Sequence, residues 1–166
     1  MEPVVDCVIE DPRWEAFGLD PLAQTAARAT FAALGMKDHG YLIVIMGCDD
    51  ARIAALNADF RGKPQPTNVL SWPSDNRAPD TPGTVPALPA PDVDDPTELG
   101  DIAIAWETCA REAQDQDKPH AAHVTHLVVH GILHLLGYDH IKDADATLME
   151  TTEARILASL GVADPY

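Results

Sequence analysis

The sequence predicts an α+β fold in which one small mixed β-sheet of about four strands is covered by about five helices. Strand-length apolar runs and segments of helical periodicity follow one another in the order βαβαββααα, which is typical of helices layered on a sheet. The 166 residues suffice for one domain, assigned to residues 1–166, that would bury roughly 70% of its unfolded surface. The composition is 46% apolar but only 5% aromatic, so we expect a core of mainly Leu, Ile, Val and Ala.

The first third of the chain contains two predicted strands and a helix between them. Residues 4–9 are apolar enough for a first strand, and residues 12–14 lead towards a helix. Residues 21–34 carry apolar side chains at helical spacing, and Gly35 can end that helix. Residues 41–46 form an uninterrupted apolar run of strand length, which predicts a central strand.

A second helix and a short strand follow. Asp49 or Asp50 can cap the helix at its start. Its apolar residues recur at helical spacing: Ile53, Leu56 and Phe60. Residues 69–72 then predict a short strand that Pro73 stops.

Residues 73–98 differ in composition from the rest of the chain. Seven of the fourteen prolines fall here, mixed with acidic residues. This composition predicts a long, mobile, acidic loop. We interpret it as an insertion in one domain, because too little chain lies on either side for separate cores.

The last part of the chain predicts one strand and three helices. Residues 99–106 alternate as a strand, and residues 107–114 look helical. The alternating strand residues share one face: Ile102, Ile104 and Trp106. A longer helix over 119–136 begins at a proline and ends before Gly137, and a final helix covers about 144–160.

The formal net charge of -16 argues against a protein that coats nucleic acid or anionic membrane, because the long-range field repels phosphate. Cys7, Cys48 and Cys109 are far apart and form no C-x-x-C, so we expect buried, reduced thiols. No signal-peptide pattern and no apolar run of about 18 residues are present, so we expect a cytoplasmic protein without a membrane span.

The most informative segment is HGILHLLGYDH, from His130 to His140. Residues four apart on a helix differ by about 40° around its axis, so His130 and His134 project side by side. Gly137 can adopt a left-handed conformation, and the resulting reversal can return His140 to the same ion. The pattern predicts one zinc ion per chain on these three histidines, with one position open for water.

The spacing H-x-x-x-H-x-x-G-x-x-H also matches the zinc ligands of metzincin peptidases. Those enzymes have a general-base glutamate directly after the first histidine, where this chain has Gly131. A peptidase would therefore need a base from elsewhere. Histidines on an ordinary helix face without a metal are a further alternative, which the third histidine at this spacing disfavours.

Other polar residues flank this motif. His126 lies one turn earlier, and is either a neighbour of the metal or substrate or a partly buried histidine with a structural partner. Asp139 either orients a ligand imidazole or caps the turn. We expect His123, His120 and His39 on the surface.

A pair of cations lies upstream, in the connection between a predicted helix and a predicted strand. Arg61 and Lys63 are the only two cations of the chain within three residues of each other, and no acid separates them. A guanidinium can hold a phosphate through two hydrogen bonds and stabilise charge in a transition state. A solvated loop pair is the ordinary alternative. Lys63 and the nearby Ser71 are further candidates for substrate contact.

The chain resembles the YbeY family of single-strand-specific, metal-dependent endoribonucleases. The resemblance rests on HGILHLLGYDH, on N-x-x-F-R with TNVLSWP, and on the GDI of residues 100–102. The final helix, with Met149, Glu150 and Glu153, also fits. These features cover most of the chain from about Asn57 onwards, whereas the first fifty residues match mainly in layout.

The resemblance implies zinc on His130, His134 and His140 and a catalytic role for Arg61. It also implies cleavage of single-stranded RNA, maturation of the 3′ end of 16S rRNA and quality control of 70S ribosomes. The implied partners are rRNA and the small ribosomal subunit with its assembly proteins; we expect no DNA.

Three features depart from the family pattern. Trp72 stands where Phe is usual, so this position still carries an aromatic ring. The loop over 73–98 is longer than in the family, so it can shape access to a cleft. The charge of -16 is unusual for an RNA enzyme, so either Arg61 and Lys63 supply a local basic site or a ribosomal partner delivers the RNA.

Two other function classes remain open. A non-catalytic ribosome-assembly factor stabilised by zinc would have a fourth protein ligand and no exchangeable water on the metal. A metallopeptidase would need a general base outside the histidine motif.

Overall fold

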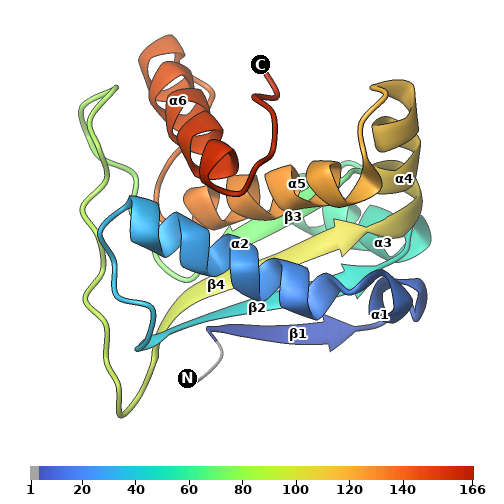
Figure 1. Cartoon of the computed structure of the whole chain (residues 1–166), viewed down its shortest axis with the longest axis horizontal. Coiled ribbons are helices and arrows are strands. Elements are labelled where there is room, and N and C mark those ends of the chain that lie inside the picture. The colour runs from blue at the N-terminus through green and yellow to red at the C-terminus, as the bar shows by residue number, and fades with distance from the viewer. Residues whose placement is uncertain (1–3) are drawn as a thin grey trace.

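The computed structural model describes residues 4–166, and its central feature is a four-stranded sheet in the order β1-β2-β4-β3 (Figure 1). The strands are β1 (Val5–Ile9), β2 (Tyr41–Cys48), β3 (Val69–Pro73) and β4 (Thr97–Ala105). β1 pairs parallel with β2, β2 pairs parallel with β4, and β3 runs antiparallel to β4. The predicted fold class, α+β with one small mixed sheet, is confirmed.

Helices cover both faces of this sheet. The described residues form six: α1 (Arg13–Phe17), α2 (Leu19–Ala33), α3 (Asp50–Arg61), α4 (Trp106–Asp115), α5 (His120–Leu135) and α6 (Asp143–Ser159). α2 and α5 pack against each other on one face, and α6 contacts both of them from outside (Figure 1). α3 packs against β4 on the other face.

The alternation of β4 explains why both faces are covered. Ile102 and Ile104 are buried in the main core with α2 and α5, and each such side chain contributes about 1.5–3 kcal/mol by leaving water. Ala103 and Ala105 point the other way and pack with Ile53 of α3 in a smaller cluster. β4 therefore lies between two apolar layers, as an internal strand of the sheet.

Several element boundaries differ from the prediction, and two of these differences have a clear structural cause. The segment expected only to lead towards a helix forms α1 by itself, because Gly18 adopts a φ of 90° and separates it from α2. Trp106, expected on a strand face, is instead the first residue of α4. Its indole packs edge-on against Trp14, with 4.9 Å between ring centroids. This contact between distant segments is not visible in the local alternation of the strand.

The proline-rich segment connects β3 to β4 as an irregular loop, as predicted. Several hydrogen bonds hold it against the rest of the protein. The Arg77 guanidinium donates to the carbonyl oxygens of Leu99 (3.1 Å) and Leu135 (2.9 Å), and the Tyr41 hydroxyl donates to the Pro89 carbonyl (2.7 Å). The mobility of this loop stays a prediction.

The three cysteines are unpaired thiols, as expected. Cys48 and Cys109 are buried, and Cys7 is half-buried. Burial raises the pKa of the Cys48 thiol to about 12 and that of Cys7 to about 11, so both stay protonated and unreactive near neutral pH. Among the described residues, no helix has the length and apolar character to cross a membrane.

Candidate metal centre

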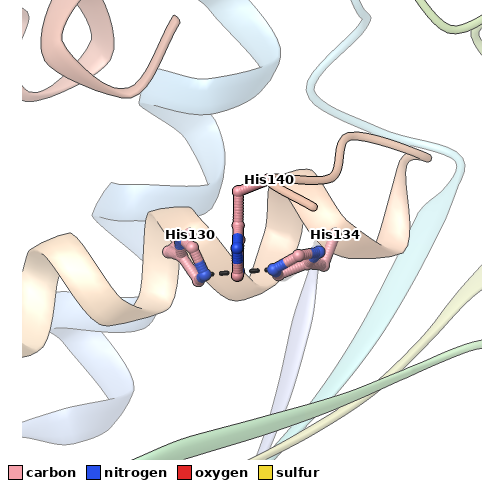
Figure 2. A group of neighbouring side chains, drawn as sticks. All are labelled: His130, His134 and His140. Atoms are coloured by element: carbon pink, nitrogen blue, oxygen red, sulfur yellow. Dashed lines mark hydrogen bonds between the residues drawn. The ribbon is translucent and has the colours of Figure 1, made fainter. Parts of the chain in front are cut away.

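α5 presents two of the predicted metal ligands, His130 and His134, one turn apart towards a cleft (Figure 2). The helix is anchored from its other side by a buried apolar stripe: Val124, Val128, Ile132 and Leu135. Gly131 lies on that buried side, where a Cβ would be only 3.1 Å from the Ile102 Cδ1 atom of β4. A larger side chain at this position would press on the sheet, so a peptidase would need its general base from elsewhere in the chain.

The turn after α5 returns the third histidine to the first two. Gly137 has a φ of 104°, a conformation that side chains disfavour. A Cβ there would also lie 2.6 Å from the carbonyl carbon of Arg77 in the proline-rich loop. The reversal puts the His140 ring centroid 5.3 Å from that of His130 and 5.1 Å from that of His134 (Figure 2).

The three imidazoles each offer a nitrogen within 4.8 Å of the others. His134 Nδ1 lies 3.0 Å from the Tyr138 carbonyl oxygen, which can only accept, so Nδ1 carries the hydrogen and Nε2 is bare. His130 Nδ1 faces the Glu153 carboxylate in the same way. The two bare Nε2 atoms then oppose each other at 3.0 Å, an unfavourable contact that a shared cation relieves.

This donor set fits zinc. Three neutral imidazoles are usual zinc ligands, with Zn–N bonds of about 2.0–2.1 Å. Burial lowers the pKa of His134 to about 4, and its neighbours His130 and His140 add to the shift. A neutral imidazole near pH 7 is the form that binds a metal. The role of these histidines as metal ligands stays a prediction, but the three rings lie close enough together to share one ion.

Glu153 of α6 is a member of this site that fits the family resemblance but was not predicted as a site residue. Its side chain is 0% exposed, and its carboxylate accepts hydrogen bonds from His130, from His126 (3.3 Å) and from the Tyr166 hydroxyl. Burial alone would raise the pKa of Glu153, but these donors outweigh it and hold the pKa at about 2. The sequence feature that could have identified Glu153 is its position among the buried residues of α6, which include Met149 and Ile156.

The other predicted neighbours have different surroundings. His126 is half-buried and lines the cleft, with Nε2 between Glu153 and Tyr166. Asp139 also lines the cleft, and its Oδ1 accepts from the backbone N–H of His140 (2.7 Å), so it caps the turn.

The expectation for the remaining histidines was partly wrong. His123 is 4% exposed, and its Nε2 lies 2.9 Å from Glu112 Oε1. His120 is half-buried, with its ring centroid 4.7 Å from that of Phe17. Both follow from α5 packing against α1 and α4, which helical spacing alone does not indicate. His39 is exposed, as expected.

A cleft of about 670 Å³ contains the three histidines, and Arg61 and Ser71 line it as well. Arg61 is the last residue of α3, exposed, and in the described part of the chain no carboxylate lies within ion-pair distance of its guanidinium. Lys63 is exposed and does not line the cleft. Phe60 precedes Arg61, is 49% exposed, and packs on Trp72 with 5.2 Å between ring centroids.

Proteins of known family match the chain over nearly its whole length. It is 63% identical to an Endoribonuclease YbeY of Cereibacter sphaeroides, over 100% of both chains. It is 59% identical to the protein of the same name from Ruegeria pomeroyi, over 98% of this chain and 97% of the relative.

A solved structure has a similar fold, and a family comparison covers most of the chain. The fold is similar to the solution structure of a Thermotoga maritima protein, with a TM-score of 0.55 and 17% identity over 95% of this chain and 91% of that one. Residues 9–161 match the family described as Endoribonuclease YbeY. The chain therefore belongs to the YbeY family of endoribonucleases.

Proposed function

We propose that this protein is a zinc-dependent endoribonuclease that hydrolyses phosphodiester bonds of single-stranded RNA. The observation that carries the proposal is the convergence of His130, His134 and His140 in a cleft that also contains Arg61, which has no carboxylate partner among the described residues. Relatives that match the whole chain are named endoribonucleases, which supports the same reaction class.

The three histidines would hold one zinc ion through Nε2 of His130 and His134 and a ring nitrogen of His140. The Tyr138 carbonyl and the Glu153 carboxylate orient the first two rings, so these ligands need little rearrangement. When bound, zinc supplies Lewis acidity to water and to the phosphodiester.

Arg61 would hold the scissile phosphate. Its guanidinium can donate two parallel hydrogen bonds to a phosphate and oppose the charge that accumulates on it during the reaction. The absence of a nearby carboxylate among the described residues leaves these donors available. Lys63 does not line the cleft, so it would add positive charge two residues from Arg61 but would not contact the reacting phosphate.

Exposed aromatic rings in the cleft support a preference for single strands. Phe60 lines the cleft next to Arg61 and is braced by Trp72, and Tyr166 is 59% exposed on the cleft wall. Stacking on such rings requires unpaired bases, because bases in a duplex already stack on each other. Ser71 on β3 offers a hydroxyl to the same strand of RNA.

We further propose that the substrate is ribosomal RNA in the cytoplasm, with action in 16S rRNA 3′-end maturation and 70S ribosome quality control. The net charge of -16 supports delivery by a partner, because such a protein attracts free RNA poorly. The small ribosomal subunit with its assembly proteins would supply that delivery, while Arg61 and Lys63 provide local attraction.

The alternative of a non-catalytic assembly factor requires a closed zinc site. In the described part of the chain, the group around His134 contains three ligands and no fourth histidine, cysteine or carboxylate. Three protein ligands with access from a cleft are characteristic of catalytic zinc, so the geometry supports the enzyme.

Cleavage of a labelled RNA in two forms tests the proposal. The zinc-loaded protein should cut the oligonucleotide as a single strand and leave it intact when it is annealed to its complement. Removal of the metal with a chelator should stop cleavage, and added zinc should restore it. Equal cleavage of both RNA forms, or cleavage that survives the chelator, would refute the proposed specificity or metal dependence.

A further inference from the structure

The carboxylate of Glu153 lies in a place where a charge is costly. Its side chain is 0% exposed, inside the contact between α5 and α6. A buried carboxylate is tolerated when hydrogen-bond donors surround it. Glu153 has three: the imidazoles of His126 and His130 on α5 and the hydroxyl of Tyr166 in the segment that follows α6.

The two oxygens of this carboxylate have separate partners. Oε1 faces Nδ1 of His130, while Oε2 faces His126 Nε2 at 3.3 Å and accepts from the Tyr166 hydroxyl. The Oε2 partners hold the plane of the carboxylate, and Oε1 then fixes the tautomer of His130. With the hydrogen kept on Nδ1, Nε2 is bare and directed at His134, 3.0 Å away.

We propose that Glu153 is a positioning residue of the metal centre, which prepares His130 for metal binding while His126 and Tyr166 hold the carboxylate in orientation. The inference rests on the proposed function, because it takes His130 as a metal ligand. A helix-packing role alone would require no particular orientation of the carboxylate towards a ligand nitrogen. The two roles differ in their effect on metal affinity.

The test compares zinc dissociation constants, measured by competition with a chromophoric chelator, for the parent protein and three variants. Glu153→Gln keeps the volume but replaces one acceptor oxygen by an amide donor, so it cannot accept from all three partners. Loss of such a partner of a ligand histidine weakens metal binding by about 10–100-fold. Tyr166→Phe removes one Oε2 donor at an exposed residue and should weaken binding by a smaller factor.

Glu150→Gln is the matched control. Glu150 lies about one turn earlier on α6, and in the described part of the chain it bonds to none of the histidines. Its substitution removes the same charge but no hydrogen bond to a ligand histidine, so zinc affinity should stay within about twofold of the parent. Equal affinities for Glu153→Gln and Glu150→Gln would overturn the proposal while leaving the proposed function intact.

Two further outcomes are decisive. If urea unfolding shows that Glu153→Gln does not fold, Tyr166→Phe carries the test, and an affinity equal to the parent's overturns the proposal. His126, His130 and Glu153 also form a group that could itself hold an ion. Two zinc ions per parent chain would make Glu153 a ligand and overturn its positioning role. A parent that binds no zinc would refute the metal dependence proposed above and, with it, this inference.

Discussion

Substitution of Gly137 by alanine should destabilise the protein and weaken its metal site together. Gly137 has a φ of 104°, and its Cβ would lie 2.6 Å from the Arg77 carbonyl carbon, with the carbonyl oxygen closer still. The positive φ costs an alanine about 1–2 kcal/mol. Overlap with backbone that cannot rotate away adds about 1–3 kcal/mol.

The expected total for Gly137→Ala is therefore about 2–5 kcal/mol in the free energy of unfolding. Gly161→Ala provides the matched control, because Gly161 has a φ of 73° and no atom within 4 Å of the added Cβ. Its cost should be the conformational strain alone, about 1–2 kcal/mol. In a protein of this size each kcal/mol corresponds to about 2–4 °C in Tm.

Urea unfolding of the metal-free proteins measures the stability difference, and chelator competition measures zinc affinity. Gly137→Ala should bind zinc more weakly than Gly161→Ala, because the turn places both His140 and the Tyr138 carbonyl that orients His134. Equal stability and equal zinc affinity for the two variants would refute the reasoning that the turn at Gly137 builds the site.

Four further predictions concern the cleft, the acid response and the thiols. Arg61→Ala should lower kcat/KM for RNA by about 10–100-fold, because about 1.5–3 kcal/mol of charged hydrogen bonding is lost. Arg52→Ala, at the exposed start of the same helix, should have no effect, and equal kcat/KM for the two variants would contradict the phosphate role of Arg61. Phe60→Ala should weaken binding of single-stranded RNA by about 1–3 kcal/mol per stacked base, as measured by fluorescence anisotropy, and unchanged binding would remove the stacking argument. Burial lowers the pKa of His134 in the folded protein from 6.5 to about 4, so as pH falls the unfolded chain takes up the proton first. The metal-free protein should therefore lose stability between pH 6.5 and pH 4. His134→Gln should flatten this dependence, and parallel plots of unfolding free energy against pH for parent and variant would exclude the effect. Burial raises the pKa of the Cys48 thiol to about 12, so Cys48 should resist alkylation at pH 8 until the protein is unfolded. Rapid labelling at Cys48 in the native protein, located by peptide mass spectrometry, would show that this thiol is accessible.

The features that were predictable from sequence are those with a local period or a local turn. His130, His134 and Gly137 belong to one helix and the turn after it, so helical geometry and one left-handed glycine are enough to predict their convergence with His140. The order of strands and helices follows from apolar runs in the same way. The assignment of residues 1–166 to one domain stays a prediction.

The features that could not be predicted depend on contacts between distant segments. Trp106 leaves the strand because it packs against Trp14, more than ninety residues earlier. His123 is buried because α4 supplies Glu112 as its partner. Glu153 contacts His130 because α6 packs on α5. The residue spacing within a single helix does not predict the angle and position at which two helices pack.

Cleavage of a labelled single-stranded RNA by the zinc-loaded parent beside an identically purified His134→Ala variant tests the central claim most directly. Loss of the His134 imidazole removes one of the three nitrogens that converge in the cleft. We expect cleavage by the parent, and both zinc content and cleavage reduced to background in the variant. Equal cleavage by the two preparations would contradict an active site built on these histidines, and zinc bound by the parent without any cleavage would contradict an enzyme that cuts free RNA without a partner.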